Sequence, residues 1–75
     1  MKEFEPKRTK KAFEQLGFYE VRNNKHLIMK REGCMNLISL KVKHLRQPMN
    51  IGLIKRELNK VNISFDMFLN AYKNL

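Results

Sequence analysis

The sequence predicts an α+β domain with the element order α-β-β-β-α(-α), in which a three-stranded antiparallel sheet has its helices packed on one face. Three observations lead to this fold class. Apolar residues recur at helical spacing near both ends of the chain, short stretches rich in β-branched and aromatic residues fill the middle, and glycine, asparagine or proline separates them. The 75 residues form a single domain, 1–75, whose small core suits a monomer or a weak dimer.

The first helix is predicted from Pro6 to Leu16. Proline suits the first helical position, where its missing N–H costs nothing, and Ala12, Phe13 and Leu16 form one apolar stripe. Gly17 is expected to end the helix, because glycine accepts the left-handed conformation without a steric penalty.

Three strands are predicted next, over residues 18–22, 26–31 and 36–42. Asn23-Asn24 turns the chain between the first two strands, because asparagine tolerates the positive φ that a tight hairpin demands. Period-two alternation divides each strand between the two faces of the sheet. In the second strand the two faces hold His26, Ile28 and Lys30 on one side and Leu27, Met29 and Arg31 on the other.

Two more helices are predicted after a loop over residues 43–49. Asn50 is the expected N-cap of the first, which runs to about Val61, and Asn62 is its expected left-handed C-cap. Ser64 caps the last helix. Apolar residues at helical spacing give these helices their buried faces: Ile51, Ile54, Leu58 and Val61 in the former, and Phe65, Phe68, Leu69 and Tyr72 in the latter.

Positive charge is concentrated in the middle third of the chain. Residues 22–46 hold seven cations and one acid, so they carry +6 of the formal net charge of +9. Such a concentration attracts polyanions, and nucleic acid is the leading candidate. An acidic protein partner, an anionic membrane surface and a merely solvated basic face are the alternatives.

Neither a membrane span nor an export signal is expected. The apolar runs are far shorter than the ~20 residues that cross a bilayer, and the N-terminus has no apolar core of a signal peptide. Cys34 is the single cysteine, which excludes an internal disulfide and fits a reducing compartment. These features predict a cytoplasmic protein.

His26 is the candidate catalytic residue. An imidazole can exchange protons with a ribose hydroxyl, and nearby cations can hold a phosphate and stabilise charge in the transition state. A lone histidine is also often a plain surface or packing residue. No cluster of histidine, cysteine and acids has metal-ligand spacing, so neither a metal nor another cofactor is expected. The predicted nucleic-acid-binding residues are Arg22, Lys25, Lys30, Arg31, Lys41, Lys43 and His44.

Two stretches of the chain carry a resemblance to a known family. The first reads LGFYEVR at residues 16–22 and then HLIM at residues 26–29; the second reads IGLIKREL at residues 51–58 and NISFDMFL at residues 62–69. They resemble the HicA (YcfA) family of mRNA-interferase toxins, whose members typically read LGF-x-x-VR-x-x-GSH-x-I-F and later G-T-L-x-x-I-L-x-x-A-GIS-x-x-E-F-L. The matches run from about residue 7 to residue 75.

The resemblance implies a fold like a double-stranded-RNA-binding domain and a metal-independent endoribonuclease whose catalytic histidine falls on His26. Its implied role is to activate a ribose 2′-hydroxyl against the adjacent phosphate, or to protonate the leaving oxygen. RNA and a HicB-like antitoxin that covers the catalytic surface are the implied partners. Asn24-Lys25 stands where the family has Gly-Ser. A non-catalytic RNA- or DNA-binding module of the same fold is therefore the alternative.

Overall fold

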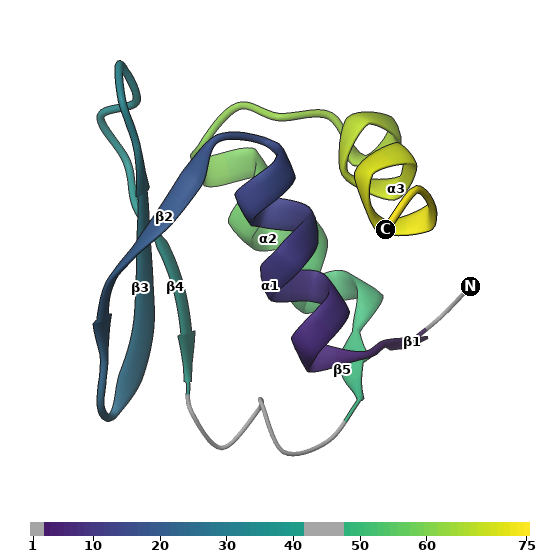
Figure 1. Ribbon diagram of the computed structural model, residues 1–75, viewed down its shortest axis with the longest axis horizontal. Coiled ribbons are helices and arrows are strands. Elements are labelled where there is room, and N and C mark those ends of the chain that lie inside the picture. The colour runs from purple at the N-terminus through teal and green to yellow at the C-terminus, as the bar shows by residue number, and fades with distance from the viewer. Residues whose placement is uncertain (1–2, 42–47) are drawn as a thin grey trace.

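Three helices and two small antiparallel sheets make up the protein (Figure 1). The computed structural model describes residues 3–41 and 48–75. The elements in chain order are β1 (Glu3–Phe4), α1 (Pro6–Gln15), β2 (Phe18–Asn23), β3 (His26–Arg31), β4 (Ile38–Lys41), β5 (Met49–Asn50), α2 (Ile51–Lys60) and α3 (Phe65–Lys73).

The larger sheet has the strand order β2-β3-β4, and both of its pairings are antiparallel. Figure 1 shows the helices on one side of this sheet, where α1 contacts β2 and α2 contacts β4. The predicted α+β class, with a three-stranded antiparallel sheet and its helices on one face, is confirmed. Alternation explains the arrangement, since Leu27, Met29, Ile38 and Leu40 are all fully buried on the helix side.

The second sheet was not predicted from the sequence. β1 pairs with β5, with Phe4 opposite Met49, so the expectation of a loop through residue 49 is wrong at its last position. The pairing exists because both side chains are buried, and the ring of Phe4 packs edge-on against Phe65 and Tyr72, with centroid distances of 6.0 and 5.1 Å. The core thus ties the start of the chain to α3.

Helix ends follow the local chemistry of the sequence. Gly17 has φ of 97° just after α1, and Asn62 has φ of 59° just after α2, so both adopt the left-handed conformation expected of them. Asn50 Oδ1 accepts a hydrogen bond from the Gly52 N–H at 2.6 Å, and Ser64 Oγ accepts one from the Met67 N–H. The predicted caps of α2 and α3 are therefore confirmed.

The β2–β3 turn differs from its prediction. Among the described residues, the only positive φ outside glycine is at Asn62, so Asn23 and Asn24 do not supply the left-handed geometry expected of them. The last pair of the ladder joins Asn23 to Leu27, and three residues cross between the strands. Asn24 supports this crossing with its side chain instead, since Oδ1 accepts the N–H of Lys25 at 2.7 Å.

The third strand is shorter than predicted. β4 begins at Ile38 because Asn36 is engaged elsewhere: its side-chain amide donates to the carbonyl oxygen of Lys60, at the end of α2, at 2.6 Å. Residue 42, the predicted end of the strand, lies outside the described residues, as do residues 43–47 of the predicted loop.

Candidate nucleic-acid interface

The face of the β2-β3-β4 sheet that is turned away from the helices is called the open face. Its members alternate with the residues that are buried under the helices. A bulge lies between Glu20 and Arg22, so Val21 and Arg22 together oppose Ile28 of β3. The described side chains of the open face belong to Tyr19, Val21, Arg22, His26, Ile28, Lys30 and Ser39.

His26 lies at the tip of the sheet, where the hairpin crosses from β2 to β3. It is the first residue of β3, its register partner is Lys41 of β4, and Lys25 of the turn precedes it. The side chain is exposed. No hydrogen bond or salt bridge joins it to a side chain within 3–40 and 48–75, and the exposed imidazole is open to a bound ligand.

The open face gathers some of the predicted binding residues. Arg22 and Lys30 are exposed and share this face with His26, and Lys25 is exposed at its rim. Lys30 is four residues from His26 along β3, which corresponds to about 13 Å. A ligand that touches both residues must therefore extend along the strand.

Other predicted binding residues are not brought together with His26. Arg31 lies on the helix side of the sheet at the opposite end of β3, where its guanidinium carbon is 6.0 Å from the centroid of the Phe18 ring. Lys41 is placed only through its backbone, across from His26. Lys43 and His44 lie outside the described residues.

Two carboxylates next to the sheet are engaged on its helix side. Glu20 points to the helix side, where its Oε1 is 2.8 Å from Nζ of Lys10 on α1. Hydrogen bonding to this carboxylate raises the pKa of Lys10, while burial opposes the rise. Glu57 is buried under β4. Neither of these two carboxylates therefore lies on the open face, whereas the exposed Glu32 follows Lys30 and Arg31 at the far end of β3 from His26.

Several cations of the helices have internal partners. Arg8 donates to the carbonyl oxygen of Tyr72 at 2.7 Å, and Lys55 lies 5.1 Å from the centroid of the Phe65 ring. Lys10, Arg56 and Lys60 pair with acids. Lys7 and Lys11, on the exposed side of α1, have no such partner among the described residues, and neither do the open-face cations Arg22, Lys25 and Lys30.

Sequence reasoning missed the apolar members of the open face. Tyr19 is 54% exposed and Val21 is 51% exposed, and Tyr19 lies opposite Lys30 in the register. Alternation within residues 18–22 was the available signal, because Phe18 and Glu20 occupy one face and Tyr19 must then point to the other.

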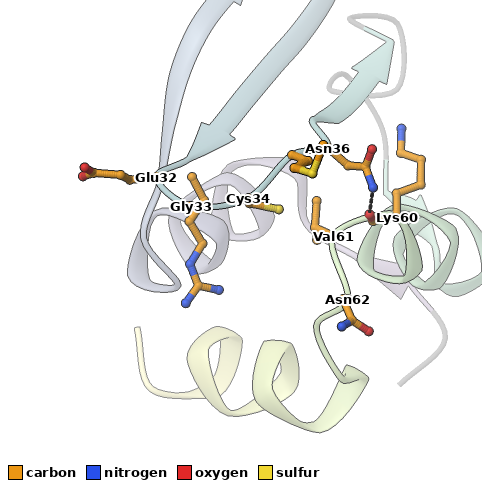
Figure 2. Close-up of a pocket in the computed structure, with 9 residues that line it drawn as sticks. Glu32, Gly33, Cys34, Asn36, Lys60, Val61 and Asn62 are labelled. Atoms are coloured by element: carbon orange, nitrogen blue, oxygen red, sulfur yellow. Dashed lines mark hydrogen bonds between the residues drawn. The ribbon is translucent and has the colours of Figure 1, made fainter.

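A pocket of about 380 Å³ lies at the opposite end of the hairpin from His26, between the β3–β4 turn and the end of α2 (Figure 2). Its polar contacts are structural, since the Asn36 amide donates to the Lys60 carbonyl oxygen. Figure 2 shows the carboxylate of Glu32 pointing away from the pocket, so the Cys34 thiol has no base beside it there. No histidine lines the pocket, so it lacks the imidazole that most often activates a cysteine nucleophile.

Neither a membrane span nor a metal-binding cluster is found in the part of the chain that the structure describes. None of its helices is long and apolar enough to cross a bilayer. No group of three or more histidine, cysteine, aspartate or glutamate residues within 3–41 and 48–75 could hold a metal ion. Comparisons with protein-family models, with curated proteins and with solved structures found no match for this chain.

Proposed function

We propose that this chain is a cytoplasmic, HicA-like mRNA interferase that binds RNA on the open face and cleaves it with His26, without a metal ion. One observation carries the proposal: an exposed imidazole shares one face of the sheet with exposed cations that have no partner among the described residues. Positive charge of this kind binds phosphates, and an imidazole within reach can move a proton.

The proposed reaction uses the RNA's own hydroxyl as nucleophile. His26 takes the proton of a ribose 2′-hydroxyl, and the 2′-oxygen attacks the adjacent phosphorus. The bond from phosphorus to the 5′-oxygen of the next nucleotide breaks, and that oxygen takes a proton from the imidazolium. The products are a 2′,3′-cyclic phosphate and a 5′-hydroxyl. Arg22 and Lys25 stabilise the charge on the phosphoryl oxygens.

The proposal includes a fold like a double-stranded-RNA-binding domain and a protein partner. A helix precedes the antiparallel sheet and further helices follow it, which supports that fold assignment. A HicB-like antitoxin with an acidic surface is the proposed partner, because opposite charge would dock it on the open face and cover His26.

Cleavage of RNA by the purified protein and its His26→Ala variant tests the proposal. The parent should cleave RNA in the presence of a chelator and leave intact an RNA whose 2′-hydroxyls are methylated. His26→Ala should lose about 10²–10⁴-fold in rate, the range for one general acid–base group, and should keep its RNA affinity within about threefold. Equal cleavage by the two proteins overturns the role of His26.

A second candidate function is a non-catalytic RNA- or DNA-binding module. It is favoured by the absence, among the side chains of 3–40 and 48–75, of any group that hydrogen-bonds His26, because catalytic bases are commonly oriented by such a partner. This function predicts that affinity falls steeply with salt and that no product forms on prolonged incubation. The same cleavage assay separates the two functions.

A further inference from the structure

Tyr19 places an aromatic side chain on the open face, where it takes no part in the packing of the core. Its neighbours in β2 are turned to the helix side: Phe18 is buried, and Glu20 pairs with Lys10. Every aromatic pair among the described residues involves phenylalanine or Tyr72, and none involves Tyr19. Tyr19 as a whole residue is 54% exposed. Burial of the core therefore does not explain the presence of an aromatic residue at this position.

The surroundings of Tyr19 combine apolar surface with positive charge. Val21 follows it in β2 and is half-exposed, and Ile28 of β3 is partly exposed on the same face. Lys30 lies directly across from Tyr19, and Arg22 lies across from Ile28. An apolar strip bordered by cations matches single-stranded nucleic acid, whose bases stack on aromatic rings while its phosphates bind lysine and arginine.

A duplex fits this face less well than a single strand. The bases of an A-form duplex are already stacked on one another, and proteins recognise such a helix by its shape, its 2′-hydroxyls and its phosphates. Several helix cations that could bind those phosphates are engaged internally, among them Arg8 with Tyr72 and Lys10 with Glu20, although Lys7 and Lys11 of α1 are not. On the open face, unpaired cations coincide with an aromatic ring that has no aromatic partner among the described residues.

We propose that the open face binds single-stranded RNA, with one base stacked on Tyr19 and the flanking phosphate held by Lys30. This inference rests on the proposed RNA-binding function and names the form of RNA that the face takes. Lys30, the register partner of Tyr19, is about 13 Å from His26 along β3. Tyr19 therefore holds a nucleotide that is displaced along the strand from the reacting one, and it acts on binding rather than on the chemical step.

Affinity for fluorescently labelled single-stranded RNA is the first measurement, with a duplex of the same sequence as the comparison. Tyr19→Ala should weaken single-strand binding about 5- to 150-fold, the range that corresponds to loss of one stacked base. Tyr19→Phe keeps the ring and should stay within about threefold of the parent. Met35→Ser is the matched control, because Met35 is 98% exposed but lies in the β3–β4 turn, away from this face.

A tryptophan at position 19 reports stacking directly, because the chain has no tryptophan of its own. Tyr19→Trp should keep its affinity, and its fluorescence should be quenched by the single strand at the concentrations that saturate binding. If the parent also cleaves RNA, Tyr19→Ala should raise KM and leave kcat within about twofold.

The possible outcomes separate this inference from the function on which it rests. The stacking site is supported if the Tyr19→Ala variant binds single-stranded RNA more weakly while Tyr19→Phe and Met35→Ser bind it like the parent. Equal binding by Tyr19→Ala and the parent, or a preference for the duplex, overturns the stacking site and leaves RNA binding in place. Failure of the parent to bind either form of RNA overturns both proposals.

Discussion

Glu57 is a buried carboxylate that completes the edge of the sheet. Its side chain is 3% exposed on α2, and its Oε1 accepts the N–H of Ser39 at 2.9 Å and lies 2.8 Å from Nζ of Lys60. β4 is an edge strand, so the outward N–H of Ser39 has no neighbouring strand to donate to. We predict that removing the Glu57 carboxylate destabilises the fold and leaves the edge strand β4 less firmly held against α2.

The expected loss in free energy of unfolding depends on which interactions of Glu57 each substitution removes. Glu57→Gln keeps an acceptor and nearly the same volume but loses the charge, which we expect to cost about 1 kcal/mol. Glu57→Ala leaves the Ser39 N–H without its acceptor. A hydrogen bond to a charged acceptor contributes about 1.5–3 kcal/mol, and the ion pair to the half-exposed Lys60 adds about 0.3–0.5 kcal/mol. The alanine variant should therefore lose about 2–3.5 kcal/mol.

Urea unfolding gives the free energies, and thermal unfolding should shift by about 4–8 °C for each kcal/mol in a chain of this size. Hydrogen exchange of the Ser39 amide tests the local cause, since it should accelerate in the alanine variant more than amides in the middle of β3 do. Glu14→Gln, an exposed charge on α1 without an ion pair among the described residues, is the control and should change stability by less than about 0.5 kcal/mol. Equal stabilities of the Gln and Ala variants refute the reasoning.

Two further predictions concern charge. Glu20→Gln should lower stability by about 0.2–1 kcal/mol at pH 7, because it removes the half-exposed partner of Lys10. The raised pKa of Lys10 means that this contribution is complete below about pH 10.5 and is lost as the pH rises through the higher folded value, so parent and variant should converge in alkaline unfolding titrations. Arg22→Gln should reduce the slope of log affinity against log salt for single-stranded RNA by about 0.7, the effect of one phosphate contact. Lys7→Gln removes the same charge from the exposed side of α1, and an equal loss of slope there would contradict binding on the open face.

Helix ends could be predicted from the sequence because their causes are local. Gly17 and Asn62 take the left-handed conformation that ends a helix, and the side chains of Asn50 and Ser64 each accept one of the N–H groups that a helix start leaves free. The residues on each face of β3 could also be predicted from the sequence, because their alternation depends only on the period of the backbone. These features needed no knowledge of distant residues.

The β1–β5 pair could not be predicted in this way. Each strand is two residues long, too short to show a period, and the pair forms because Phe4 and Met49 meet in the core although they are distant in sequence. The face on which Arg31 lies could not be predicted from the distribution of charge along the sequence. A count of charge along the chain treats it like Lys30, whereas the pleat of the sheet sends the two side chains to opposite faces.

The position of His26 connects binding to catalysis. Its imidazole has no hydrogen-bond partner within the described residues, so the fold alone does not orient the ring. Catalytic hydrogen bonds often form only when the substrate is bound, and a phosphate held between Arg22 and Lys25 would bring its own acceptor oxygens beside the ring. Under the proposed function the substrate therefore completes the catalytic site. Loss of Arg22 should then lower kcat as well as affinity, whereas loss of the more distant Tyr19 should lower affinity alone.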